Sequence, residues 1–254
     1  MNNKLWVLIV GELSRLNKYG VFSISVLVAF LWGAILFLIG DSALTTLLPF
    51  VLFIDATMMS VMYIGAEMHF EKSESTISTM LVTPVSNNEM VLSKVLANTI
   101  HNLFSSMLIV FVFFLAGELE YVNSIGINLL LVIPAIIIVT MTFTTLGLVM
   151  SYYQKDFTDM LVNMFSIVIL LMIPTILLLF GVIEGEFWEN VMLANPLQAA
   201  LEIIKVGIHP IGLEIELGYK YYVSLGYIIL GGLAIFFFLA IPRFQDYAVR
   251  QSGV

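Results

Sequence analysis

The chain contains 254 residues, of which 60% are hydrophobic and 11% are charged. A soluble domain is roughly 45–50% apolar and about 25% charged, so a soluble fold could not bury this much apolar surface and still cover itself with charge. Disorder is excluded because it requires low hydrophobicity and high charge. The sequence has no cysteine, which excludes disulfides and thiol catalysis, and its net charge of -8 argues against nucleic acid as a partner. The class that remains is an all-α polytopic membrane protein.

Six stretches of the sequence are long and apolar enough to cross a membrane as helices, which requires about 20 residues each. Their apolar runs are continuous and do not alternate, which excludes a β-barrel. Twenty residues precede the first stretch, and the stretch is long for the core of a cleavable signal, so we expect a permanent anchor. We expect a single transmembrane domain over 1–254. The predicted spans are 21–39, 44–66, 95–116, 128–152, 160–183 and 222–241.

The distribution of Lys and Arg predicts which side of the membrane each loop faces. With six spans both termini share a side, and eight Lys and Arg fall on that side, whereas only Lys205 and Lys220 fall on the other. Cytoplasmic loops carry the excess of basic residues, so we expect both termini in the cytoplasm. The predicted outer loops carry nine acidic residues, which accounts for most of the negative charge.

Residues 1–20 are predicted to form an amphipathic helix. Apolar residues recur at helical spacing at Leu5, Ile9, Leu13 and Leu16, with basic and acidic residues between them. This pattern is typical of a helix that lies on the cytoplasmic membrane surface. A downward extension of the first span is the alternative.

The long outer loop, 184–221, is also predicted to contain short helices. Asn195 and Pro196 form a helix start, with Asn as the N-cap and Pro at the first helical position. The helix that follows is amphipathic, with an apolar face that includes Leu197. We expect it to lie in or dip into the outer interface, either as a cap over an exit path or as a structural cover.

The longest cytoplasmic connection is predicted at 67–94. Residues 71–82 can form a short helix that ends before Pro84, because the residue before a proline disfavours the helical region. Ser86 and Glu89 then form a capping box, which predicts that the third helix starts near Asn87, below the membrane. The connection is either a compact docking element for a partner or a solvated loop.

Known catalytic motifs are absent from the sequence. It contains no phosphate-binding loop of the form G-x-x-x-x-G-K-[ST], no H-E-x-x-H and no nucleophile elbow. The three histidines, His69, His101 and His209, lie far apart without metal-ligand spacing. We therefore expect no enzymatic activity of the chain itself, and no metal or cofactor held by it.

Asp55 is the notable polar residue within a span. An acid at the bilayer centre costs about 3 kcal/mol on insertion scales, so Asp55 is expected to be protonated, to face a water-filled cavity or to bond to polar neighbours. It either lines a substrate path or fixes helix packing through an interhelical hydrogen bond. The candidate path also includes Met58, Met59, Met62, Thr142 and Asn163, and the candidate bonding partners are Thr57, Thr142, Thr144, Thr145 and Asn163.

The connection at 67–94 resembles the cytoplasmic segment of the ABC-2 type family of ABC transporter permeases. That segment reads E-x-x-x-x-T-x-x-x-L-x-x-x-P-[VL]-[ST], followed by an acidic residue and a Lys that enters the third span. Ser75 departs from it, because the family usually has Gly before the Thr. The six spans, the amphipathic N-terminus and the Asn-Pro-Leu of the outer loop are similar as well. The matching residues are Glu71, Thr76, Met80, Leu81, Thr83, Pro84, Val85, Ser86, Glu89 and Lys94.

The resemblance implies an export permease in a prokaryotic cytoplasmic membrane. Residues 71–81 would be a coupling helix seated in a cleft of a separate P-loop ATPase subunit, which would hold ATP and Mg. Two six-span chains, identical or paralogous, would form the permease, with membrane lipids around them. Asn195, Pro196 and Leu197 would belong to an external gate. The residues implied in coupling are Glu71 and Lys72 as direct contacts, Ser75 and Thr76 in the helix, and Thr83 and Pro84 at its end.

The nearly charge-free membrane interior favours an amphiphilic or lipophilic cargo, which could be drug- or antibiotic-like, a lipid or a peptide. Two alternatives come from other functional classes. A proton-coupled secondary transporter or channel would use Asp55 as its acid. A membrane scaffold that transports nothing would be insensitive to ATP and to the coupling segment.

Overall fold

The computed structural model describes residues 3–38, 41–74, 76, 84–117, 125–154, 156–210 and 215–252. Within these residues, six helical stretches are long and apolar enough to cross a membrane, which confirms the predicted all-α polytopic fold. Two of the stretches contain a short π-helical segment, η1 or η3. The elements are α1 Asn3–Lys18, α2 Val21–Leu38, α3 Asp41–Ile54, η1 Asp55–Met59, α4 Ser60–Ser73, α6 Asn87–Gly117, β1 Ile125–Ile127, α7 Leu129–Ser151, α8 Phe157–Leu179, α9 Glu186–Met192, α10 Pro196–Lys205, β2 Ile208–Pro210, α11 Tyr219–Ile235, η3 Phe236–Ala240 and α12 Ile241–Ser252.

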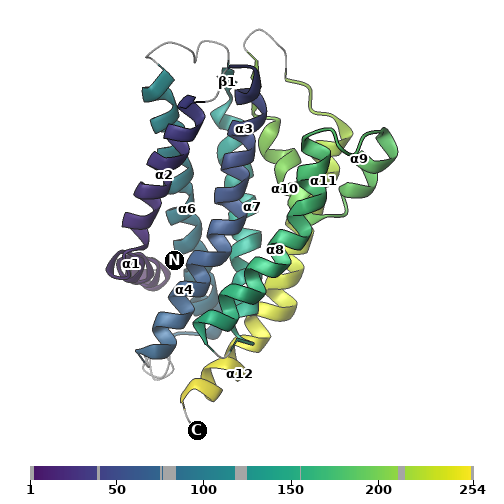
Figure 1. Ribbon diagram of the computed structural model, residues 1–254. Helices are drawn as coiled ribbons and strands as arrows, with labels where there is room; N and C mark the ends of the chain where they lie inside the picture. Colours follow the sequence, from purple (N-terminus) through teal and green to yellow (C-terminus); the bar gives the residue numbers. More distant parts are fainter. Residues whose placement is uncertain are drawn as a thin grey trace.

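The spanning helices lie side by side in one bundle (Figure 1). The end with α4's last turn and α12 is called the lower end here, and the end with β1 is called the upper end. The second and sixth spans run on toward the lower end, over 30 and 32 residues, well past the predicted limits of Ala66 and Ile241. As a result, Glu71 lies in the last turns of the second span and does not start a separate helix.

The N-terminal helix α1 is a separate element, as the first of the two predicted alternatives requires. Gly20 stands between α1 and α2 with φ of +75°, a conformation that glycine adopts without a Cβ clash. Figure 1 shows α1 nearly end-on, while α2 rises above it. Ile9, Glu12 and Leu16 are buried, and α1 packs against α2 and α6. The inward face of α1 is therefore covered by the bundle itself.

A small two-stranded sheet joins two loops at the upper end. Strand β1 pairs antiparallel with β2, with Ile125 opposite Pro210 and Ile127 opposite Ile208. Neither strand is predicted from the sequence, because each has three residues and its partner lies far along the chain. The sheet ties the connection after α6 to the connection after α10.

Helix α10 lies among the spans. It packs against α3, α7, α8 and α11, and Figure 1 shows it beside α11 and α8 in the upper half. Its apolar residues are buried, but so are Gln198 and Glu202. Of the two predicted positions, in the outer interface or dipping into it, the packing of α10 against four spanning helices fits the second. By contrast, α2, α8 and α11 leave much of their apolar surface exposed, as helices next to lipid do.

Candidate functional site

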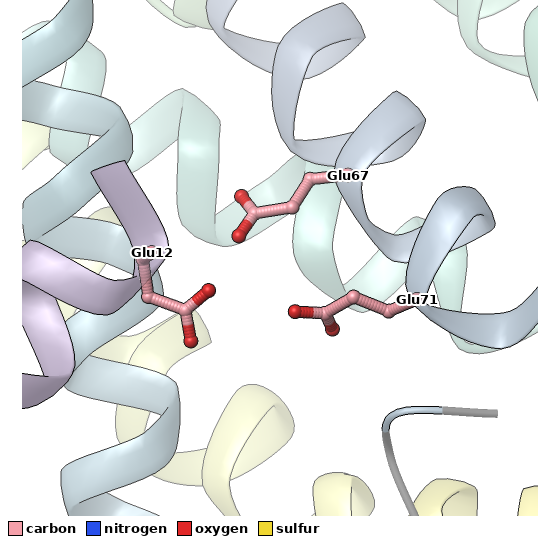
Figure 2. Close-up of side chains that lie close together, drawn as sticks. All are labelled: Glu12, Glu67 and Glu71. Carbon is pink, nitrogen blue, oxygen red and sulfur yellow. The ribbon is translucent and has the colours of Figure 1, made fainter. Parts of the chain in front are cut away.

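Five charged side chains from three helices meet inside the lower half of the bundle. We call them the ion cluster: Glu12 and Arg15 on α1, Glu67 and Glu71 on α4, and Lys94 on α6. Figure 2 shows the three carboxylates turned toward a common space between α1 and α4. Glu67, Glu71 and Lys94 have no exposed surface, and Glu12 is 2% exposed.

Lys94 is the centre of the ion cluster. Its Nζ lies 2.5 Å from Glu71 Oε1, 3.3 Å from Glu12 Oε2 and 3.6 Å from Glu67 Oε1. Arg15 completes the cluster at 2.7 Å from Glu12 Oε1 and 3.2 Å from Glu71 Oε1. These contacts join α1, α4 and α6 through charge-assisted bonds, which are stronger than neutral ones.

The charges of the ion cluster do not fully cancel, because three carboxylates face two basic groups. Burial alone would raise the pKa of Glu12, but the charges of Lys94 and Arg15 lower it below its usual value. Both carboxylate oxygens of Glu67 lack a hydrogen-bond partner among the described residues. One proton held between Glu67 and Glu12 would make the cluster neutral, which removes the cost of a buried net charge.

The ion cluster also has the ligand set of a divalent cation site. One oxygen from each of Glu12, Glu67 and Glu71 lies within 4.8 Å of the others. The Lys94 ammonium, however, reaches all three carboxylates. A metal bound there would have to displace it, so the residues fit their own ammonium better than a metal.

The ion cluster lies at the base of the connection between α4 and α6. Glu71 and Lys94 flank that connection, and their contact holds its two ends together. The Glu71 carboxylate is fully buried against Lys94, and its direct contact with a partner stays a prediction. Lys72 is half-buried and Pro84 is exposed. Thr76 Oγ1 donates to the Glu71 carbonyl at 3.2 Å, and Ser75 and Thr83 lie outside the described residues.

The predicted capping box at the start of α6 is confirmed. Glu89 Oε2 accepts from the Ser86 backbone N at 2.9 Å and from Ser86 Oγ at 2.8 Å. The Glu89 backbone N in turn donates to Ser86 Oγ at 3.3 Å. Two backbone N–H groups at the helix start are thereby satisfied, so α6 begins at Asn87 as expected.

Asp55 is fully buried at the start of η1. Its two oxygens accept from Ser105 Oγ at 2.9 Å and from Ser106 Oγ at 2.5 Å, both on α6. The interhelical hydrogen bond is thus present, but none of the partners expected from the sequence makes it. Thr57 donates to the Phe53 carbonyl of its own helix, and Thr144 accepts from Asn98. The other candidates bond elsewhere too: Thr142 to the Ile228 carbonyl, Thr145 to the Met141 carbonyl and Asn163 to Gln154.

The residues of the candidate substrate path do not share one surface. Met58, Met59 and Met62 are half-buried, and Asn163 is exposed. Thr142 lines an apolar cavity of about 600 Å³ between α6, α7, α11, η3 and α12. Asp55 is not among the residues that line this cavity, so the idea of one continuous path through both residues is not supported by their positions.

The residues expected at the external gate cap α10 as predicted. Asn195 Oδ1 accepts from the Leu197 backbone N at 3.0 Å, and Pro196 is the first residue of the helix. In addition, Asn195 Nδ2 donates to the Leu171 carbonyl at 2.7 Å and to Thr175 Oγ1 at 3.3 Å, both on α8. Leu197 is buried. The helix start is therefore fixed to the fifth span.

Sequence reasoning missed most of the buried polar residues, although α6 carried a signal for them. Polar residues recur on it every three or four positions, and a buried polar stripe of this kind predicts interhelical bonds. Ser25 Oγ on α2, for example, lies 2.8 Å from His101 Nε2. Glu67 and Glu71, four positions apart on one helix face, were a second signal. The stripe on α6 comprises Lys94, Asn98, His101, Asn102, Ser105 and Ser106.

The fold and the ion cluster define a polytopic helical membrane protein whose connection between the second and third spans is clamped at its base. The family model of the ABC-2 type transporter matches residues 13–209. This is more than half of the chain, and the chain belongs to the ABC-2 type transporter family. It is therefore the membrane-spanning permease component of an ABC transporter. No curated protein matches the chain significantly.

Proposed function

We propose that the chain is the permease subunit of an exporter driven by ATP hydrolysis on a separate P-loop subunit. That subunit docks on the connection between α4 and α6, and two six-span chains, identical or paralogous, form the translocation unit in a prokaryotic cytoplasmic membrane. The observation that carries the proposal is the Glu71–Lys94 contact of 2.5 Å, which clamps both ends of the connection. Membership of the ABC-2 type family supports it.

The ion cluster gives a route from the docking segment into the membrane. Lys94 belongs to α6, which continues for 31 residues from the lower end, and Glu71 belongs to α4, which continues through η1 into α3. A force on the connection therefore moves both spans together. Glu12 and Arg15 add α1 to the same unit. Closure of the ATPase dimer would then turn these helices as one body and open the permease outward.

The cargo is amphiphilic or lipophilic under this proposal. The cavity beside Thr142 and Met141 has apolar walls that include Leu233, Phe236 and Phe237. A site of this composition binds by burial of apolar surface. Drug-like molecules, lipids and apolar peptides all satisfy this requirement.

Asp55 distinguishes this proposal from a proton-coupled secondary transporter. Both of its carboxylate oxygens are satisfied by serine hydroxyls of α6, which supports a packing role. We expect Asp55→Asn to retain ATP-dependent transport in membrane vesicles. Transport driven by a proton gradient without ATP, and lost in Asp55→Asn, would favour the secondary transporter.

The docking step is tested by purification of the chain from native membranes in mild detergent. We expect a P-loop ATPase to co-purify and to show vanadate-sensitive ATP hydrolysis. The double variant Thr76→Arg with Pro84→Arg, at the surface of the connection, should lose the partner and the coupled activity. Glu186→Arg on α9 is the matched control, since it adds the same charge at the opposite end. A chain that purifies alone, or a double variant that keeps its partner, would contradict the proposal.

A further inference from the structure

A second cavity, of about 500 Å³, lies at the upper end between α8, α9, α10 and the start of α11. We call it the upper cavity. Its polar lining comes from Glu184, Glu189, Gln198, Glu202, Lys205 and Lys220. The distribution of basic residues predicts that this end faces outward. Nothing in the proposed docking and coupling steps uses these residues.

The basic groups of the upper cavity are already neutralised by their neighbours. Lys205 Nζ lies 2.6 Å from Glu202 Oε1, and Lys220 Nζ donates to Glu189 Oε2. This hydrogen bond from Lys220 lowers the pKa of Glu189. Glu184 has no ion-pair partner among the described residues. The upper cavity therefore carries an excess of negative charge, which favours a cation and disfavours an anion.

Gln198 provides an independent sign of a ligand. It is 4% exposed, and its Nε2 donates to Glu202 Oε1 at 2.9 Å. That bond fixes the orientation of the amide, because the opposite orientation would place the amide oxygen against a carboxylate. The Gln198 Oε1 has no hydrogen-bond partner among the described residues. A buried acceptor without a donor is destabilising, so it is a favourable place for an incoming donor.

The remaining wall of the upper cavity is apolar. Leu178, Leu179 and Ile183, from the end of α8 and the turn after it, also line the cavity, together with Leu201 of α10. A ligand that fits both parts has a polar head with hydrogen-bond donors and an apolar body. An ammonium group supplies donors and positive charge at once.

We propose that the upper cavity binds an amphiphile whose head is a primary ammonium group. The ammonium donates to Gln198 Oε1 and faces the carboxylates of Glu184 and Glu202, while the alkyl body lies on Leu178 and Ile183. The inference rests on the proposed function in one respect, namely that this amphiphile belongs to the exported cargo. Gln198 lies in the first turn of α10, directly after the residues that cap it, so the ligand would contact the helix expected to gate the exit.

The test measures binding to the purified chain alone, in neutral lipid nanodiscs. The fluorescence of Trp188 on α9, next to Glu189, reports on the upper cavity in a Trp6→Phe and Trp32→Phe background. The probes are octylamine at pH 7, octyltrimethylammonium, which has no N–H donor, and octyl sulfate. We expect saturable binding of octylamine, weaker binding of octyltrimethylammonium and no saturable binding of octyl sulfate.

Two variants separate a bound ammonium from simple partitioning into the bilayer. Gln198→Met keeps the side-chain length but removes the acceptor, and should weaken octylamine binding by about tenfold or more. Glu184→Gln, at an exposed residue, should weaken it several-fold. The matched control Glu186→Gln lies on α9 outside the lining and should bind as the wild type does.

Several outcomes would overturn the inference. These are octyl sulfate binding as tightly as octylamine, absence of saturation, or unchanged affinity in Glu184→Gln and Gln198→Met together. Since the assay contains no ATPase, it is independent of the docking test. Octylamine binding by a chain that has no ATPase partner would refute the exporter but leave the site, and the reverse result would refute only the site.

Discussion

Two groups of charged side chains, one at each end of the bundle, each contain three acidic and two basic groups but differ in burial. The ion cluster contains three Glu, one Lys and one Arg, and the upper cavity contains three Glu and two Lys. In the ion cluster the three Glu and Lys94 are buried, Arg15 is half-buried, and one ammonium reaches three carboxylates. In the upper cavity the pairs are separate and partly exposed, with Lys205 at 45% and Glu189 at 44% exposure of their side chains.

Burial, and not the number of charges, decides whether an ion pair fixes the packing of helices or stays available to a ligand. In the ion cluster each charge depends on the others, because water cannot replace a lost partner. Such a group holds three helices in one arrangement. In the upper cavity water can reach Lys205, Lys220 and Glu189 and can replace their partners, so these groups can exchange a partner for a ligand.

Lys94→Met is expected to cause the largest loss of stability. It leaves three buried carboxylates without their central cation, and removal of one partner from a buried pair costs about 3–5 kcal/mol. Lys220→Met in the upper cavity is the matched change and should cost less than about 1 kcal/mol. Denaturation of both variants in detergent measures the difference. Equal, small losses would mean that the ion cluster is hydrated and that the contrast between the two ends is wrong.

Acidification should weaken the ion cluster through Glu12. Its pKa in the folded chain lies below the ordinary value of 4.5, so its contribution is fully present above about pH 4.5 and is lost as the pH falls through the folded pKa. The groups that face it are Glu67, Glu71, Lys94 and Arg15. Thermal denaturation between pH 7 and pH 3.5 should show a loss of stability below pH 4.5 that is reduced in Glu12→Gln. The same pH dependence in both proteins would contradict the assignment.

Asp55 is an intermediate case, a buried carboxylate held by hydroxyls and not by a cation. Ser106→Ala removes one of its two donors and should cost about 1–3 kcal/mol, the range for a buried acceptor that loses its hydrogen-bond partner. Ser73→Ala, at an exposed serine, is the control. The measurement is again denaturation in detergent. If Ser106→Ala were as stable as the control, water would have to reach Asp55.

The smallest effect is expected at the capping box below the ion cluster. Ser86→Ala removes the two hydrogen bonds that Ser86 Oγ makes with Glu89, and loss of such a cap costs about 1 kcal/mol. Hydrogen exchange of the first turn of α6 is the direct readout, with Lys94 and the buried turns as the internal reference. Unchanged protection of the Glu89 amide, which donates to Ser86 Oγ, would show that the ion cluster alone fixes the helix start.

Prediction from the sequence succeeded where the cause is local. The capping box at Ser86 and Glu89 and the cap at Asn195 each depend on a few neighbouring residues, and both are confirmed. Prediction failed for the partners of Asp55, because helix rotation and the register between spans decide which polar side chains meet. The polar stripe of α6 was visible, but its partners on α2 and η1 were not.

Three features can be predicted from the sequence alone. These are the six apolar helices, the family resemblance of the segment after the second span and the capped starts of α6 and α10. These features follow from apolar content and from hydrogen bonds within one turn of chain. The tertiary structure is needed to show that Glu71 faces inward, that Lys94 meets Glu12, 82 positions away, and that Gln198 Oε1 has no donor among the described residues. Such contacts depend on which helix faces pack together, and the packing of six spans is a property of the whole bundle.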